Sequence, residues 1–435
     1  MLAKTFCSGP WFHVRLQNDG QFTECRWGKR NKQNPHIQDT SIMQYYNGSQ
    51  MRAMRTELLS GNSPDICSVC SYQDQMGKLN GRHKQLLKSG IRTDHFMQSA
   101  RSSPHYQHFQ YSHDNQGNSS HYPVDLQIDL GNVCNSACIM CSPFFSSRLH
   151  NDYQKLHRIN PDIFQDPVKY TSWTQDPALV ERFVQELITI PNLRYIHFMS
   201  GEPFYDDSFY TICQRLVDTG LSKEIIVGTT TNGTIYDTRI EQLIGSFKEF
   251  HLGISIESVT QLNDYIRYPS KIDVILDNLQ KFLNLRSTTG INVSMRITPN
   301  IFTINYLDSL FEYIIEHKIP TDSSDILSKP DCLRMELIPD QIRSSIIDRL
   351  VSLVDRHKLA PTHQPNIRNV EMIPEVTANL ILEYLQFLQT YPTPVDLVES
   401  RQRLVPFLKS FESLRHNSIL DYAPEYTEFL RSLGY

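Results

Sequence analysis

From residue 124 onward, short apolar runs alternate with amphipathic stretches, and this alternation limits the folds that the chain can adopt. Segments with helical periodicity, such as 176–190 and 271–285, separate the apolar runs. Strands that alternate with helices of this length predict βαβ units and a parallel sheet. We therefore expect an α/β fold with a six-stranded layer or open barrel. Its predicted strands are 124–130, 193–199, 224–230, 249–257, 291–298 and 332–338.

The rest of the chain has a different pattern. Residues 11–27 predict a β-hairpin that turns at Asp19-Gly20, and a helix is expected in the segment that follows. The segment before residue 124 is rich in Ser, His and Asn without periodicity, which predicts a linker or mobile loop. The last part is mostly helical by periodicity. The expected units are 1–96, the linker 97–123, the α/β core 124–340 and the helical C-terminal region 341–435.

Composition excludes several classes of protein. Of the 435 residues, 40% are hydrophobic and 20% are charged, and the formal net charge is -5, so a polyanionic partner such as nucleic acid is not favoured. No secretory signal and no apolar run of about 18 residues is visible, which predicts a cytoplasmic protein without a membrane partner. In that reducing compartment, cysteines spaced like ligands indicate metal binding rather than disulfides.

Three cysteines follow the first predicted strand in a C-x3-C-x2-C pattern: Cys134, Cys138 and Cys141. A structural zinc site usually closes with four ligands in two separated pairs, which this short loop does not supply. A 4Fe-4S cluster fits better, because each cysteine can bind a different iron and one iron is left without a protein ligand. An open iron is a place where a substrate or cofactor can bind.

Polar motifs follow the next predicted strands. "SGEP" (200–203) comes after the second strand and "TNG", with Asn232, after the third, while Ser255 and Arg296 lie at the ends of the fourth and fifth. In parallel α/β folds the carboxyl ends of the strands form the ligand site. We therefore expect these groups to converge on the cysteine loop.

Together these motifs resemble the radical S-adenosylmethionine (radical SAM) enzymes over residues 124–338. The resemblance implies a partial (β/α)6 barrel of the radical SAM type. It also implies a 4Fe-4S cluster whose open iron binds S-adenosyl-L-methionine and, once reduced, cleaves it to a 5'-deoxyadenosyl radical. That radical abstracts a hydrogen atom from a substrate. The resemblance further implies an electron donor of the flavodoxin or ferredoxin type.

The resemblance assigns a role to each strand-end residue. Glu202 and its loop, with Ser200 where the family has glycine, are expected to bind the methionine amino group. Arg296 is expected at the methionine carboxylate, Met140 near adenine, and Ser255 and Glu257 at the ribose. The expected cofactor-binding residues are thus Met140, Ser200, Gly201, Glu202, Pro203, Asn232, Ser255, Glu257 and Arg296.

Four further cysteines lie in the first unit: Cys7, Cys25, Cys67 and Cys70. Spacing alone allows zinc or iron-sulfur. The pattern resembles the auxiliary modules called twitch or SPASM domains, here placed before the core, and this resemblance favours a second, auxiliary 4Fe-4S cluster. Because such modules often accompany peptide-modifying enzymes, the resemblance implies a peptide substrate, with a nucleoside or amino sugar as alternatives.

Two cysteines stand outside both groups. Cys213 lies in a predicted helix over 206–219 and is expected to be an inert buried thiol. Cys332 begins the sixth predicted strand, where it is expected either to pack in the core or to donate a hydrogen atom to a substrate radical. A competing reading of the whole chain is non-catalytic: a redox-sensing or zinc-stabilised binding protein whose first unit contacts a nucleic acid or acidic partner.

Overall fold

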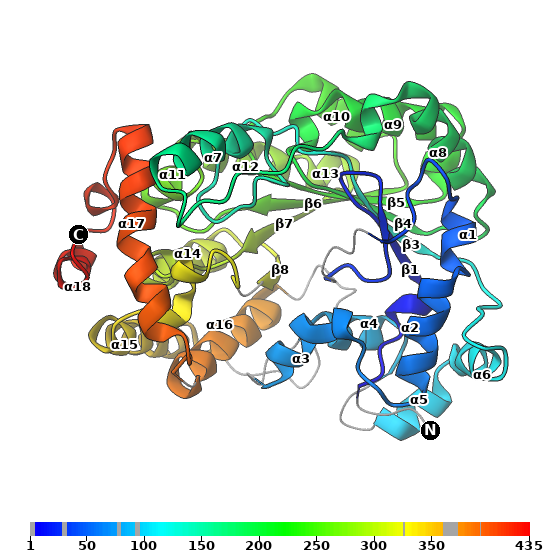
Figure 1. Ribbon diagram of the computed structural model, residues 1–435, viewed down its shortest axis with the longest axis horizontal. Coiled ribbons are helices and arrows are strands. Elements are labelled where there is room, and N and C mark those ends of the chain that lie inside the picture. Colours follow the sequence, from blue (N-terminus) through cyan, green and yellow to red (C-terminus); the bar gives the residue numbers. More distant parts are fainter. Residues whose placement is uncertain are drawn as a thin grey trace.

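The computed structural model describes residues 5–27, 33–75, 80–91, 96–324, 327–359, 373–391 and 393–435. Its centre is one eight-stranded sheet in the order β2-β1-β3-β4-β5-β6-β7-β8 (Figure 1). The strands are β1 (His13–Leu16), β2 (Phe22–Thr23), β3 (Asp125–Asp129), β4 (Tyr195–Met199), β5 (Ile226–Thr231), β6 (Glu249–Ser255), β7 (Asn292–Ile297) and β8 (Thr321–Ser324).

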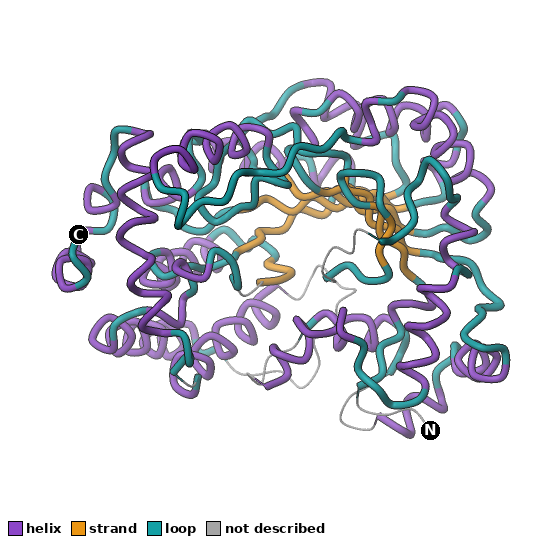
Figure 2. Tube along the Cα trace, viewed as in Figure 1, coloured by secondary structure: helices purple, strands orange, loops and turns teal. Residues whose placement is uncertain are grey.

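Strands β3 to β8 are all parallel, so the α/β class of the core is as expected. Figure 2 shows the strands as a curved layer rather than a closed ring, which is the shape of a partial barrel. The helices of the core are α7 (Ser147–Ile159), α8 (Pro177–Thr189), α9 (Asp207–Asp218), α10 (Thr238–Ile244), α11 (Leu262–Ile266), α12 (Ile272–Asn284), α13 (Arg286–Thr289) and α14 (Leu307–Glu316).

The two faces of the sheet differ in chemistry. On one face, Phe198 of β4 packs edge-on against Phe209 of α9, and Ile254 of β6 lies beside Ile275 of α12. The opposite face is polar in every strand from β3 to β7, although much of it is buried. Its members include Gln127, Asp129, His197, Thr230, Ser255, Ser294 and Arg296. Parallel strands are usually apolar on both faces, so this polar face points to a role beyond packing.

The predicted hairpin is confirmed, because β1 and β2 are antiparallel around Asp19-Gly20. It is not a separate layer, since β1 also pairs in parallel with β3. The helices of this end of the chain are α1 (Ile42–Tyr46), α2 (Ser49–Leu59), α3 (Ser68–Gln75), α4 (Gly81–Lys88), α5 (Phe96–Ser102) and α6 (Tyr106–Asp114).

Two predictions from the sequence are wrong. The expected linker 97–123 contains nearly all of α5 and the whole of α6. Helix α6 is anchored by Phe109, which packs against the rings of Phe6 and Trp11. The expected strand 332–338 consists of the 3-10 turns Asp331–Leu333 and Met335–Leu337. Its apolar residues are buried between prolines 330 and 339, whereas the true last strand, β8, has the polar sequence TDSS.

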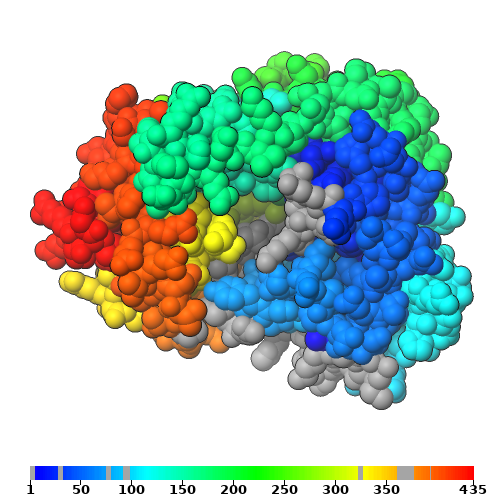
Figure 3. Space-filling model, in the orientation of Figure 1, coloured from blue at the N-terminus to red at the C-terminus, as the bar shows by residue number. Residues whose placement is uncertain are grey.

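The C-terminal region is helical, as expected, and the described residues contain no helix long and apolar enough to span a membrane. Its helices are α15 (Asp340–His357), α16 (Ile373–Thr390), α17 (Leu397–Arg415) and α18 (Thr427–Ser432). Prolines at 361, 365 and 392 are expected to interrupt the helical pattern, and they lie outside the described residues, whereas Pro394 lies between α16 and α17. Tyr72 of α3 donates a 3.4 Å hydrogen bond to Glu336 just before α15. Figure 3 shows the N-terminal and C-terminal helices on either side of a recess.

The N-terminal helices depend on one buried guanidinium group. Arg55 of α2 is fully buried and donates to the carbonyl oxygens of Pro10 (2.9 Å), Tyr46 (2.8 Å) and Gly117 (3.0 Å). We expect Arg55→Met to lower the free energy of unfolding by about 3 kcal/mol, because three buried acceptors lose their donor. Glu57→Met, on the exposed side of the same helix, should change it by less than about 0.5 kcal/mol. Urea titration of both variants checks this, and equal effects would contradict it.

Candidate active site

The loop that carries Cys134, Cys138 and Cys141 joins β3 to α7. Backbone hydrogen bonds to residues outside the loop hold it in place. The backbone N–H of Ala137 donates to the carbonyl of Tyr268 at 2.7 Å, and that of Ile139 donates to the carbonyl of Ile266 at 3.0 Å. Burial raises the pKa of the Cys141 thiol to about 12, and Cys138 adds to the rise. Cys138 and Cys141 therefore lie close enough to act on each other electrostatically in a partly desolvated loop.

The "SGEP" loop after β4 docks on this cysteine loop. The N–H of Glu202 donates to the carbonyl of Val133 at 2.8 Å, and the N–H of Gly201 donates to the carbonyl of Phe145 at 3.2 Å. Gly201 has a φ of 59°, and Ser200 has a φ of 75°. Ser200 thus takes the left-handed conformation that glycine favours, and Pro203 then opens the 3-10 turn Pro203–Tyr205.

The Glu202 carboxylate is buried beside this contact. It accepts the hydroxyl of Thr231 at 2.6 Å, the N–H of Asn232 at 2.6 Å and the N–H of Phe204 at 3.2 Å. Burial raises the pKa of Glu202 to about 7, and the hydrogen bonds from Asn232 and Thr231 oppose the rise. The carboxylate therefore links the ends of β4 and β5.

Asn232 links the end of β5 to the cysteine loop itself. Its Nδ2 donates to Asn135 Oδ1 at 2.7 Å and to Ser136 Oγ at 3.0 Å. Both partners lie between Cys134 and Cys138 in the sequence. Nothing in the C-x3-C-x2-C pattern identified them, because the intervening residues are not constrained by the spacing.

Glu257, expected at the ribose, has a different neighbour. Its buried carboxylate is held by Arg267 through two hydrogen bonds, one of them 2.7 Å long from Nη2. The same guanidinium group lies 4.0 Å from Cys138 Sγ. Arg267 was not identified from the sequence, and it brings a largely buried cation, with 11% of its side chain exposed, to the cysteine loop.

The remaining expected residues lie around the same mouth. Ser255 and Arg296 are paired across β6 and β7, and Arg296 lies over Gly253, where any side chain would overlap it. Met140 Sδ is 3.7 Å from Asn300 Nδ2, just after β7. The structure therefore gathers residues from the ends of β3 to β7 at one edge of the sheet.

The donor set fits an iron-sulfur cluster better than a single metal ion. Among the described residues, no three His, Cys, Asp or Glu side chains converge closely enough to hold one ion. A cuboidal cluster needs thiolates on separate irons rather than on one point. Burial raises the pKa of Cys138, while Arg267 and Arg415 oppose that rise, so positive charge is available to stabilise thiolates.

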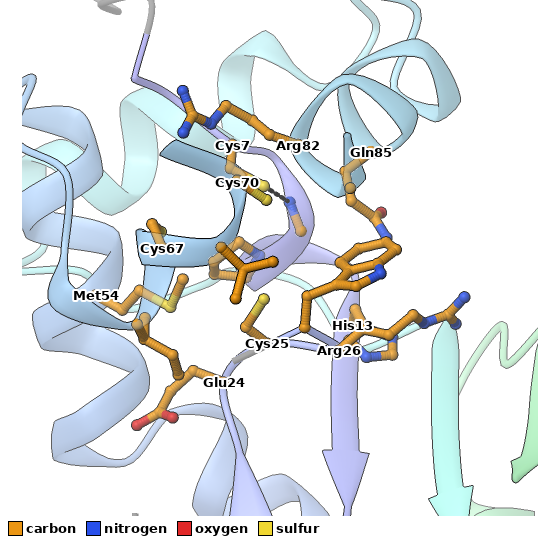
Figure 4. Close-up of a pocket in the computed structure, with 16 residues that line it drawn as sticks. Cys7, His13, Glu24, Cys25, Arg26, Met54, Cys67, Cys70, Arg82 and Gln85 are labelled. Carbon is orange, nitrogen blue, oxygen red and sulfur yellow. Dashed lines mark hydrogen bonds between the residues drawn. The ribbon is translucent and has the colours of Figure 1, made fainter. Parts of the chain in front are cut away.

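The second group of cysteines lies in the N-terminal helices. Cys7, Cys25, Cys67 and Cys70 line one cavity together with Met54 and Arg82. Figure 4 shows the four thiol side chains around a common space. Burial raises the pKa of Cys7, and Cys25 adds to the rise, followed by Cys67 and Cys70. The expected gathering of these four residues is thus present.

The two other cysteines are buried. Cys213 has no exposed surface and lies on α9. Cys332 is also buried, but in a 3-10 turn that packs against α17 rather than on a strand. The expected strand position of Cys332, from which its side chain would face the barrel interior, is therefore wrong.

Comparisons with known proteins agree with the core motifs. Residues 128–310 match the family model described as the Radical SAM superfamily. Residues 128–310 of this chain are therefore similar to the radical SAM domain. No curated protein matches the sequence.

Solved structures share only a distant likeness with the chain. One is anSMEcpe with bound AdoMet, at 14% identity and a TM-score of 0.39, covering 55% of this chain and 62% of that one. Another is SuiB from Streptococcus suis bound to the precursor peptide SuiA, at 14% identity and a TM-score of 0.40, covering 81% and 70%.

The contact between Gly201 and the Val133 carbonyl should not tolerate a side chain. An alanine Cβ at position 201 would overlap that oxygen, whereas at Gly220, with a φ of 79°, it would meet nothing within 4 Å. In both alanine variants the left-handed backbone conformation destabilises the fold by about 1–2 kcal/mol. We expect Gly201→Ala to be destabilised by at least about 1 kcal/mol more, because of the overlap. Denaturant titration of the apoprotein compares the two, and equal losses would contradict the docking.

Glu202 should give the apoprotein a pH-dependent stability. Because its pKa rises from 4.5 to about 7 on folding, the stabilisation of the neutral acid is complete below pH 4.5 and is lost as pH rises through 7. Relative to Glu202→Gln, the wild type should lose about 3 kcal/mol of unfolding free energy between pH 4 and 8. Urea titrations at several pH values measure this difference. A constant difference would show that folding does not shift the pKa of Glu202.

Proposed function

We propose that this protein is a radical SAM enzyme that abstracts a hydrogen atom from a peptide substrate. The observation that carries the proposal is the docking of the Glu202 loop on the loop of Cys134, Cys138 and Cys141. This docking fixes the loops after β3 and β4 to each other. The three thiols would leave one iron of a 4Fe-4S cluster without a protein ligand. A site with an open coordination position at strand carboxyl ends suits a bound cofactor.

In this proposal Cys134, Cys138 and Cys141 hold a 4Fe-4S cluster. With S-adenosyl-L-methionine bound, that cluster supplies the hydrogen-abstracting radical. Glu202 would accept a hydrogen bond from the methionine amino group, and the guanidinium group of Arg296 would bind its carboxylate. Glu257 is expected at the ribose, and its carboxylate also holds Arg267 beside Cys138.

We also propose an auxiliary 4Fe-4S cluster at Cys7, Cys25, Cys67 and Cys70. The four thiols share one cavity with apolar neighbours, among them Met54 and Ile66. Zinc with four thiolate ligands is the alternative at this site. The shared cavity supports a four-cysteine metal centre, and the resemblance to the twitch or SPASM modules favours a cluster.

The polar sheet face supports a peptide as the substrate class. Gln127, His197 and Thr230 lie on neighbouring strands and offer both donors and acceptors. The Oε1 atom of Gln127 is buried without a hydrogen-bond partner within the described residues. Amide groups of a peptide would satisfy such a face, and a nucleoside or amino sugar is the alternative. A cytoplasmic flavodoxin or ferredoxin would supply the electron.

Anaerobic reconstitution tests the proposal. We expect about eight irons with matching sulfide per chain, and release of 5'-deoxyadenosine after addition of dithionite and S-adenosyl-L-methionine. Cys134→Ala should lose about four irons and all cofactor cleavage. Cys25→Ala should lose the auxiliary cluster but keep the first one. Metal analysis and chromatography of the products give both readouts.

Cys213→Ala is the matched control, because it removes a buried thiol outside both groups. It should keep the iron content and the cleavage activity of the wild type. About four irons with one zinc would keep the enzyme and replace the auxiliary cluster by zinc. Zinc without cleavage would instead support the non-catalytic, zinc-stabilised binding protein.

A further inference from the structure

The C-terminal helix α17 reaches the cysteine loop through its last residue. Arg415 is 9% exposed, and its Nη2 donates to the carbonyl of Ala137 at 2.5 Å. The same nitrogen lies 3.2 Å from Asp152 Oδ2. Ala137 is the residue directly before Cys138. A cation from outside the matched region 128–310 thus contacts the backbone of the loop.

The surroundings of Arg415 reduce the screening of its charge by water. Its guanidinium carbon lies 4.7 Å from the ring centroid of Tyr268 and 4.4 Å from that of Phe411. The carbonyl of Tyr268 also accepts the N–H of Ala137. Aromatic rings on two sides exclude water, and a charge in such a setting is screened much less than one at the surface.

A second cation, Arg267, also faces Cys138, but its charge is compensated more completely. Arg267 shares two hydrogen bonds with the Glu257 carboxylate, whose side chain has no exposed surface. The partner of Arg415, Asp152, makes one contact and is 15% exposed. Because water screens Asp152 in part, the charge of Arg415 is compensated less completely than that of Arg267.

We infer that Arg415 raises the reduction potential of the cluster held by Cys134, Cys138 and Cys141. The inference rests on the proposed function. One electron from an external low-potential reductant adds one negative charge to the cluster, and a nearby cation stabilises that product. At an effective dielectric constant of about 20, a unit charge about 10 Å away changes the equilibrium constant of reduction roughly tenfold. Arg415 is therefore a positioning and tuning residue that contacts no substrate.

Redox titration followed by electron paramagnetic resonance tests this inference. In Arg415→Gln we expect the equilibrium constant for cluster reduction to fall about tenfold, which is about 59 mV more negative for one electron. Arg415→Lys keeps the charge and should titrate close to the wild type. Titrations are made in the Cys25→Ala background, so that only one cluster contributes to the signal.

Substitution of Asp152, the partner of Arg415, should shift the reduction potential in the opposite direction. Asp152→Asn removes the compensating negative charge and should make the potential less negative, even if Arg415→Gln fails to hold a cluster. A purely structural role for the pair predicts no such rise. The matched control is Arg401→Gln, since Arg401 also lies on α17 and donates to two backbone carbonyls, those of Leu337 and Ile338, at 3.0 Å.

Arg401→Gln should leave the potential unchanged. The inference is overturned if Asp152→Asn leaves the potential unchanged or lowers it, if Arg415→Gln holds a cluster at the wild-type potential, or if Arg401→Gln shifts it equally. These results would leave the proposed enzyme intact, because the cluster would still be present and cleave its cofactor. A wild-type protein without a cluster signal would overturn the proposed function as well.

Discussion

The parallel register of β3 to β7 is the constraint on which the whole site depends. Asp129 pairs with Met199 at the ends of β3 and β4, and Ser255 pairs with Arg296 at the ends of β6 and β7. Because the strands end level with one another, their loops leave the sheet at the same edge. Glu202 and Asn232 then need only short contacts to reach the cysteine loop. A register slip in one strand would turn its polar side chains to the helix-covered face.

The sequence was sufficient for the core because its signals are local. Strands β3 to β7 carry apolar residues along one face and are bounded by polar motifs, and Cys134 follows the first strand at a short distance. The last strand was predicted at the wrong place because β8, with the sequence TDSS, has no apolar residue. Segment 332–338 is apolar because its two 3-10 turns are buried, and not because it forms a strand. Helix α6 was missed because Phe109 anchors it through contacts with distant aromatic residues rather than through periodicity.

The charges around the cysteine loop could not be predicted from the motifs. Arg267 and Arg415 lie 129 and 278 residues from their partners in the loop, and no spacing rule links such distant positions. Glu257 was identified as a functional residue from its place after a strand, which is where the structure has it. Its partner was missed, because an ion pair depends on the path of the chain between the two residues.

The two groups of cysteines lie at opposite ends of the strands. Cys7 and Cys25 flank the β1–β2 hairpin at the amino end of β1, and His13, the first residue of β1, lines the cavity of the four cysteines. Cys134, Cys138 and Cys141 follow the carboxyl end of β3, which is parallel to β1. The polar face with Gln127 and His197 runs between the two ends. A substrate bound on that face would lie between the two cysteine groups.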